Sequence, residues 1–517
     1  MVIFEWVLGI LLAAVLLSAL AKQIRVPYPA LLALGGAVLA FIPGAPRIVL
    51  EPELALALFV APVLLDAAYD TSPRDLKDNW SAVTSLVLVA VGLTTAGVAL
   101  VAHALTGMPW AAAVALGAIL APPDAAAATA VVRQIGLPHR IVTILEGESL
   151  LNDASALLIY RIAVTAVSAG SVTLATAAPT LLLSTVGSVI AGPILALGYM
   201  RLVALLNRSG DAPTSIILQF IGTFGVWLLA NRIGLSGILT IVAYAITIAR
   251  RAPATTPARL RVPSYAVWET AVFVLNVLAF VLIGLQIGPI FGGLAPEQRL
   301  RYLLIAAAVL ATLIVIRFAW VMSYITVIDW RLRRVGGQRG RRMMLPSFRG
   351  GLVVSWCGMR GIVTLVAALA LPNGEQGADF PFRDLIVFVA FCVVLGTLLI
   401  QGLTLRSLVL RLNLSDDDPV GREVNSGRRV AYQAALASLD GEGSRLAEAL
   451  RVELEAALAR SHASAEEAAD APDGSLRMRA VGAARRAILA MRKSGEIGDV
   501  AFHRLEEEMD RIELSAT

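Results

Sequence analysis

The sequence predicts an all-α membrane protein with thirteen transmembrane helices, arranged as two inverted six-helix repeats with crossed, broken helices, and a cytoplasmic helical tail. Composition, the spacing of apolar runs and the charge between these runs lead to this prediction. Of the 517 residues, 57% are hydrophobic and 16% are charged, and the mean hydropathy is +0.76. Soluble chains carry about 25% charged residues. Most of this chain must therefore lie in lipid.

The apolar runs have the length that a membrane requires. A helix crosses a hydrocarbon core of about 30 Å with about 20 mostly apolar residues. Thirteen runs meet this condition, at residues 2–21, 28–46, 53–69, 81–105, 110–132, 141–168, 174–206, 214–231, 235–250, 265–291, 301–328, 350–372 and 383–411. The first run has Glu5 near its start and basic residues only after it. We therefore expect a retained helix and not a cleaved signal peptide.

Basic residues between the runs predict the orientation. With the N-terminus outside, the cytoplasmic loops carry 19 Lys and Arg residues and the opposite loops carry five. Positive charge favours the cytoplasmic side, so an odd number of spans also places the C-terminus in the cytoplasm. Seven of these basic residues fall between 331 and 349. We interpret that cluster as an anchor for lipid headgroups and not as a nucleic-acid site.

The composition changes abruptly at Ser415-Asp416-Asp417-Asp418-Pro419. The predicted domains are a membrane domain at 1–414 and a cytoplasmic helical domain at 415–517. The first holds 29 basic and 18 acidic residues, and the second holds 14 and 20. A loop between tail helices is expected at 463–474. Regulation, dimer contact and a merely solvated tail remain open as roles of the second domain.

Few residues suit a metalloenzyme or a disulfide scaffold. The chain has only two cysteines, and its four histidines lie far apart without zinc-ligand spacing. We expect no cofactor and no enzymatic activity.

Six ionisable residues fall well inside the predicted spans. Each costs at least ~2.5–3.5 kcal/mol at bilayer depth, so each is a candidate functional residue. They are Asp66, Asp124, Glu148, Asp153, Arg317 and Arg360.

The sixth span combines several of these groups. Asp153 lies about 18 Å along a helix that starts near Ile141, because each residue rises ~1.5 Å, and this depth is close to mid-membrane. Ser149 precedes Asp153 by four residues and shares its face, so both can direct oxygen atoms at one small cation. Glu148 faces elsewhere and requires its own partner. Either Arg317 or Arg360 could neutralise it.

Two spans contain breaks. Pro122 and Pro123 remove backbone donors in the fifth span and leave the carbonyl groups near 117–120 free. Gly358 and Gly361 bracket Arg360 in the twelfth. Both spans are the fifth of a six-helix half, spans 1–6 and 8–13, with the seventh as linker. Broken helices at matching positions of inverted repeats indicate the binding site of a secondary transporter.

The motif at 147–153, GESLLND, together with Pro123-Asp124 and the later Gly358-Met359-Arg360-Gly361, resembles the monovalent cation/proton antiporters of the NHE and NhaP branch. The resemblance covers about residues 5–412. The tail's 495–499 segment, GEIGD, looks like that of bacterial members. The resemblance therefore implies an antiporter of a bacterial plasma membrane, and we also expect a homodimer.

The resemblance also assigns roles to residues. It implies that Asp153 binds the cation or the proton, that Asn152 helps to hold the crossed helices, and that Glu148 pairs with an arginine of a late span, best matched by Arg317. Asp66 stands where relatives often carry a glutamate. An Asn-Asp pair, here 152–153, implies electroneutral exchange.

One departure from the family pattern concerns the fifth span. Many relatives have Thr-Asp-Pro there, whereas this chain has Pro123-Asp124-Ala125 and so lacks a hydroxyl ligand. The preference among Na⁺, K⁺ and Li⁺ therefore stays open.

The resulting hypothesis is an exchanger of Na⁺, or another alkali cation, for H⁺. Burial disfavours an ionised carboxylate, so protons can compete with the cation for Asp153. The expected cation and proton site comprises Asp153, Asp124, Ser149, Pro123 and Asp66, of which Asp153, Asp124 and Ser149 would bind Na⁺ with water and a carbonyl near the Pro-Pro break. Glu148, Arg317, Arg360 and Asn152 are expected to support it structurally.

Alternating access requires a moving part. We expect spans 3–5 and 10–12 with the sixth helix to move against a dimerising scaffold. The alternatives are a K⁺/H⁺ exchanger on the same fold, a channel or organic-anion transporter, and an intramembrane aspartyl hydrolase that uses Asp124 and Asp153. The hydrolase is disfavoured because its Gly-x-Gly-Asp signature does not occur.

Overall fold

In the computed structural model, all regular secondary structure among the described residues is helical, with no strand among them. These are residues 2–24, 26–42, 51–124, 137–169, 174–206, 211–255, 258–292, 294–335, 347–372, 379–414, 419–460, 482–484, 486–488, 490–491, 494 and 505. The predicted loop at 463–474 lies outside them, as do residues 125–132 of the predicted fifth span. Eight described helices are long and apolar enough to cross a membrane. Helices also occur in all thirteen predicted ranges. The presence of a helix in each range does not establish that thirteen helices cross the membrane.

Among the described residues of the first half of the chain, ten helical segments precede α10. They are α1 (Val2–Ile24), α2 (Tyr28–Leu39), α3 (Pro52–Ala55), the π-helix η1 (Leu56–Val60), α4 (Ala61–Asp70), α5 (Pro73–Asp78), α6 (Trp80–Thr84), the π-helix η2 (Ser85–Ala90), α7 (Val91–Thr106) and α8 (Trp110–Leu120). The predicted third and fourth spans thus contain π-helical segments. The long helices α10 (His139–Ala169) and α11 (Leu174–Leu206) follow.

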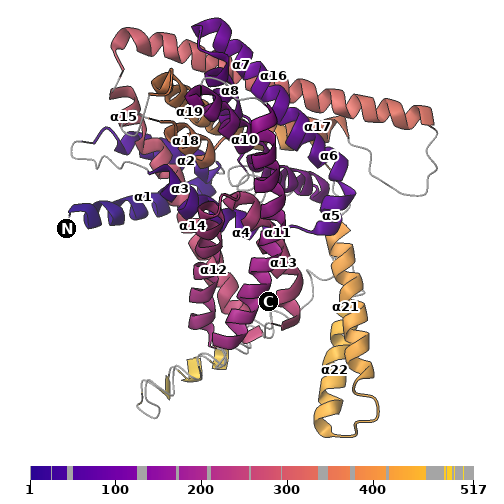
Figure 1. The fold of residues 1–517 in the computed structure, drawn as a ribbon. Coiled ribbons are helices and arrows are strands. Elements are labelled where there is room, and N and C mark those ends of the chain that lie inside the picture. Colours follow the sequence, from indigo (N-terminus) through magenta and orange to yellow (C-terminus); the bar gives the residue numbers. More distant parts are fainter. Residues whose placement is uncertain are drawn as a thin grey trace. The chain divides into compact units, whose positions relative to one another are not determined.

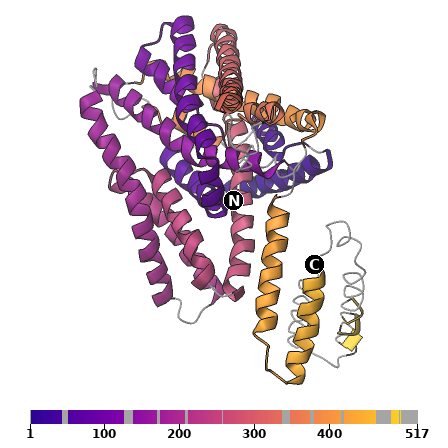
Figure 2. The ribbon, with the colours of Figure 1, turned by 90° about the vertical axis from the view of Figure 1, so that its right-hand side faces the viewer.

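The rest of the first 414 residues also forms a series of helices. Its elements are α12 (Ala212–Arg232), α13 (Gly237–Thr255), α14 (Ala258–Leu285), α15 (Ile287–Gly292), α16 (Pro296–Val335), α17 (Phe348–Trp356), α18 (Ile362–Leu369), α19 (Arg383–Thr397), the π-helix η3 (Leu398–Gly402) and α20 (Leu403–Leu412). Figures 1 and 2 show α11, α12, α13 and α14 as neighbouring long helices, in agreement with the packing of α13 on α11 and α12 and of α12 on α14.

Local sequence explains several helix ends. The Asp211 carboxylate accepts the Thr214 N–H at 2.9 Å and caps the start of α12. Ser347 caps α17 in the same way, because its hydroxyl accepts the Gly350 N–H at 3.0 Å. Gly107 ends α7 with φ +69°, a left-handed conformation that glycine adopts without steric cost.

The helices pack as two groups. The scaffold group comprises α1, α2, α3 to α4 and α11 to α14, and the core group comprises α6 to α8, α10 and α16 to α20. The core group has a buried apolar centre of its own, formed by residues such as Leu116, Val309 and Val389. In terms of predicted spans, the core group holds spans 4–6 and 11–13.

The expected grouping of spans 3–5 and 10–12 with the sixth helix is therefore wrong. Span 3, which includes α4, packs chiefly on α13, and span 10, which includes α14, packs chiefly on α2. Span 13, which includes α19, packs instead on α16 and α18. The grouping depends on tertiary contacts between distant helices, and local hydropathy does not specify them.

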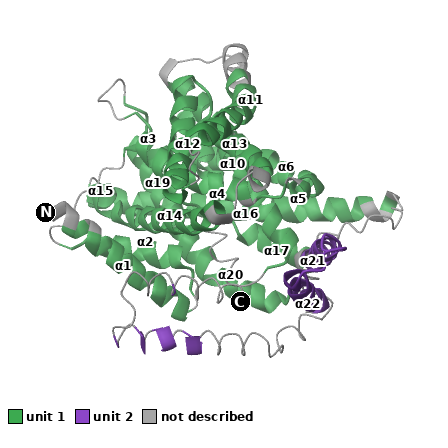
Figure 3. Ribbon diagram, turned by 90° about the horizontal axis from the view of Figure 1, so that it is seen from below, with its two compact units in different colours: residues 1–416 green, residues 417–517 purple. Residues whose placement is uncertain are grey.

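The chain divides into two compact units, Met1–Asp416 and Asp417–Thr517, which Figure 3 colours separately. The division falls next to the change in composition at Ser415. In the second unit, α21 (Pro419–Ala437) and α22 (Arg445–Arg460) pack against each other as a helical hairpin.

Candidate functional site

Two interrupted helices meet inside the first unit. Helix α8 ends at Leu120 and is followed by the non-helical residues 121–124, while residues 357–361 separate α17 from α18. The Asp124 N–H donates to the Met359 carbonyl at 2.7 Å. A Cβ added to Gly361 would overlap the Asp124 side chain. The two breaks are therefore in contact, and glycine is required at 361 for this close approach.

Arg360 joins the two interrupted helices through backbone carbonyls. Its guanidinium donates to the Leu120 carbonyl at 2.5 Å, to the Ala121 carbonyl at 3.0 Å and also to the Gly358 carbonyl. Its own N–H donates to Thr397 Oγ1 at 3.0 Å. The expectation that the carbonyl groups before Pro122 stay free is thus corrected at Leu120, whose carbonyl Arg360 satisfies.

Asn152 also holds the break in the fifth span. Its Nδ2 donates to the Pro123 carbonyl at 3.2 Å, and the residue is fully buried. Asn152 lies on α10, so this bond attaches the non-helical segment to the neighbouring helix. The contact agrees with the holding role that the family resemblance implies for this asparagine.

Glu148 is paired with Arg317, and not with Arg360. The Arg317 guanidinium donates to both carboxylate oxygens, with Nη1 to Oε1 at 2.6 Å and Nη2 to Oε2 at 2.9 Å. The two residues are 1% and 4% exposed. Arg317 also donates to the Val354 carbonyl at 3.0 Å and to the Cys357 carbonyl at 3.3 Å. The ion pair therefore attaches α10 and α16 to the end of α17.

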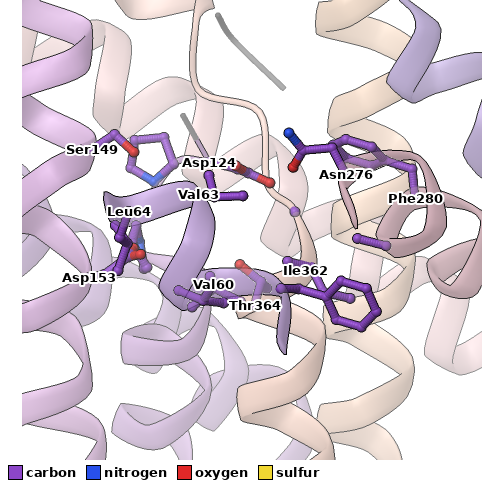
Figure 4. A pocket seen from close by; sticks show the side chains of 16 residues that line it. Val60, Val63, Leu64, Asp124, Ser149, Asp153, Asn276, Phe280, Ile362 and Thr364 are labelled. Atoms are coloured by element: carbon purple, nitrogen blue, oxygen red, sulfur yellow. The ribbon is translucent and has the colours of Figure 1, made fainter. Parts of the chain in front are cut away.

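A cavity lies between the core and scaffold groups, beside these contacts. It encloses about 530 Å³ of space that no atom fills, part of it open to the outside. Figure 4 shows Asp124, Ser149 and Asp153 among its lining residues. The remaining lining residues are Phe59, Val60, Val63, Leu64, Pro122, Pro123, Asn276, Ala279, Phe280, Gly361, Ile362, Val363 and Thr364.

The cavity offers oxygen atoms in an otherwise apolar place. Ser149 and Asp153 are 6% and 7% exposed, and Asp153 makes no hydrogen bond to another described residue. Both lie on the face of α10 that meets the cavity, whereas Glu148 meets Arg317 elsewhere, as the helical spacing predicts. Carboxylate and hydroxyl oxygens suit hard cations. The site can thus bind a small cation or a proton.

The structure brings together only part of the predicted set. Asp153, Asp124, Ser149 and Pro123 line the cavity, but Asp66, which lies on α4 beyond Val63 and Leu64, is not among the lining residues. The residues expected to support the site are Glu148, Arg317, Arg360 and Asn152. They make the hydrogen bonds described above, next to the cavity.

Sequence reasoning missed Asn276 and Thr364, two polar residues of the cavity wall. The prediction started from ionisable residues inside the spans and considered neutral polar residues only beside them, within the 147–153 motif. A lone asparagine in the apolar run 271–285 was the available signal.

Eight long apolar helices among the described residues indicate an integral membrane protein, and its candidate site lies at the contact of two interrupted helices. Residues 10–411 match the model of the sodium/hydrogen exchanger transmembrane family. The chain belongs to this family of cation/proton antiporters, which are transporters and not enzymes.

Bacterial relatives are similar to this chain in sequence. An uncharacterised Na⁺/H⁺ exchanger of Mycobacterium tuberculosis is 32% identical over 527 aligned positions, which cover 98% of this chain and 95% of the relative. The sodium, potassium, lithium and rubidium/H⁺ antiporter of Bacillus pumilus is 31% identical over 80% of this chain and 62% of its own length.

A solved structure shares the fold. The sodium proton antiporter MjNhaP1 of Methanocaldococcus jannaschii superposes with a TM-score of 0.58, at 17% identity, over 80% of this chain and 99% of that chain.

Proposed function

We propose that the protein exchanges Na⁺, or another alkali cation, for H⁺ by letting the two compete for Asp153. The observation that carries this proposal is the cavity in which Asp153 and Ser149 of α10 face Asp124 of the broken fifth span. Family membership supports exchange as the activity. The exchanged ions are cargo, and no cofactor enters the proposal.

Competition provides the coupling between the two ions. A carboxylate that releases its proton becomes a ligand for a cation, and one that is protonated loses that ability. If Asp153 binds one cation or one proton, each direction of transport carries a single positive charge, and the exchange is electroneutral. The Asn152-Asp153 pair supports this stoichiometry through the family resemblance alone.

The proposed cation shell consists of oxygen atoms from several elements. Asp153 and Ser149 contribute from α10, Asp124 from the segment after Pro123, and water fills the remaining positions. Thr364 of α18 provides a hydroxyl on the cavity wall, while many relatives have one in the fifth span. Asp66 is proposed to act through water, because it lies one turn beyond Val63 on α4.

Alternating access is proposed to result from movement of the core group relative to the scaffold group. The cavity lies between these groups, so their relative displacement would change its opening. We further propose thirteen spans in two inverted repeats, an external N-terminus, a cytoplasmic C-terminal domain, a homodimer and a bacterial plasma membrane.

Potassium is a second candidate cation. The name of the Bacillus pumilus relative includes potassium, lithium and rubidium beside sodium. The cation class is therefore proposed as alkali cations, with Na⁺ as the first to be tested.

Substitution of Asp153 tests the proposal. Wild-type protein in proteoliposomes should dissipate a pH gradient when NaCl is added, and Asp153→Asn should abolish this response. Asp78→Asn, which neutralises an exposed carboxylate on α5, is the matched control and should behave as wild type. Exchange retained by Asp153→Asn would refute the assignment. An imposed membrane potential should leave the initial rate unchanged if exchange is electroneutral.

A further inference from the structure

Asn276 is an isolated polar side chain in the middle of a membrane helix. It lies on α14, and between Thr270 and Gln286 every other residue is apolar or glycine. An amide placed in hydrocarbon is costly unless it finds a hydrogen-bond or ligand partner. The position of Asn276 therefore calls for a partner that its amide can bind.

The cavity has two chemically different walls. The core group contributes four polar residues, Asp124, Ser149, Asp153 and Thr364, beside Pro122, Pro123, Gly361, Ile362 and Val363. The scaffold group contributes seven residues, of which six are apolar, namely Phe59, Val60, Val63, Leu64, Ala279 and Phe280. Asn276 is the seventh, and it is the single polar side chain on the scaffold wall among the described residues.

The amide of Asn276 faces the cavity. Figure 4 shows it turned inward on the side where Asp124 lies. Ala279 and Phe280 follow at helical spacing and line the same cavity, so this face of α14 forms the wall. In the part of the chain that the structure describes, the amide makes no hydrogen bond. It is thus available to an occupant of the cavity.

Asn276 is fixed to the scaffold group by close backbone packing. Gly284 of α14 and Gly36 of α2 face each other so closely that a Cβ on either would collide with the backbone of the opposite helix. The ring of Phe280 lies 6.4 Å from that of Tyr28, again on α2. Asn276 therefore remains with α2, whereas Asp153 and Ser149 belong to the core group.

We propose that the amide oxygen of Asn276 is a scaffold ligand for the transported alkali cation, and that it strengthens binding of the cation without affecting binding of the proton. An amide oxygen coordinates hard cations but does not titrate. Because Asn276 lies on the scaffold, the contact exists only when the core group occupies the position seen here. This inference rests on the proposed function.

Transport kinetics test the inference. Asn276→Leu replaces the amide by an apolar group of similar size, and Thr270→Val is the matched control, because the Thr270 hydroxyl bonds only to the Ala266 carbonyl on the same helix. For Na⁺ exchange in proteoliposomes, we expect Asn276→Leu to raise KM about three- to tenfold, as for the loss of one polar contact. Under competition, the factor should be the same at each pH, because only cation binding has changed. Thr270→Val should keep the wild-type KM.

A binding measurement separates the inference from effects on folding. NaCl, compared with choline chloride at equal ionic strength, should raise the Tm of the wild-type protein in detergent. Asn276→Leu should need a higher NaCl concentration for the same rise, and Asn276→Ala should behave alike.

Two results are distinguishable. Wild-type KM and NaCl response in both Asn276 variants, with Asp153→Asn inactive, would overturn the role of Asn276 and leave the proposed function intact. Exchange retained by Asp153→Asn would instead overturn the proposed function itself.

Discussion

Replacing Arg317 by methionine is expected to destabilise the membrane domain strongly. The substitution leaves the Glu148 carboxylate buried without its two guanidinium bonds, which are 2.6 and 2.9 Å long. Removal of one partner of a buried ion pair costs about 3–5 kcal/mol. The variant also loses the bonds to the Val354 and Cys357 carbonyls. The loss of stability in Arg317→Met should therefore lie at or above the upper end of that range. The loss in Glu148→Gln should lie nearer the lower end.

The double variant Arg317→Met/Glu148→Gln should be less unstable than the sum of the single variants. In the double variant no unpaired charge remains from this pair. Its loss of stability should therefore be smaller than the sum of the two single losses by about 2–5 kcal/mol. Unfolding of purified protein in detergent, followed as Tm for all four proteins, provides the measurement.

Arg383 supplies a matched control for this cycle. Among the described residues, its guanidinium donates to two backbone carbonyls, those of Leu371 at 2.9 Å and Leu369 at 3.2 Å. Arg383→Met should therefore combine additively with Glu148→Gln. Additive losses in the Arg317 cycle would refute the reasoning about the ion pair.

Three further predictions concern the crossing and the tail. Gly361→Ala should reduce exchange at least tenfold, because the added methyl group overlaps the Asp124 side chain; initial rates in proteoliposomes at matched protein content would show it, and wild-type rates would contradict the close approach. Arg360→Lys should lower the exchange rate and the Tm, since an ammonium cannot reproduce the fork that holds the Leu120 carbonyl; unchanged values would argue against that role. A chain ending at Leu414 should keep measurable exchange, and complete loss would assign an essential role to the tail.

The spans and their breaks could be predicted from sequence because both are local properties. Hydropathy reports the burial of one segment in lipid, and the proline pair at 122–123 terminates a helix without help from distant residues. The shared face of Ser149 and Asp153 likewise follows from helical geometry.

Contacts between distant helices could not be predicted in this way. Charge and depth left two arginines as partners for Glu148, and only the family resemblance favoured Arg317; the structure shows this pair, with α16 packed against α17. The same limitation explains the incorrect grouping of the spans. The break at the prolines could be located from sequence, but Arg360, which donates to the Leu120 carbonyl there, lies 240 residues from Leu120 along the chain.

Asn276 shows a different limitation. Screening for ionisable groups finds residues whose burial is costly, and a neutral amide is a weaker signal of the same kind. Its importance appears only when α14 is placed opposite Asp124 across the cavity.

The dependence of KM for Na⁺ on proton concentration tests most directly whether the two ions compete for Asp153. Initial rates of Na⁺ uptake should be measured in proteoliposomes over a range of external pH, with the internal pH held constant. Competition predicts that KM rises linearly with proton concentration while the maximal rate stays the same. A maximal rate that falls with proton concentration at constant KM would contradict competition at a shared carboxylate.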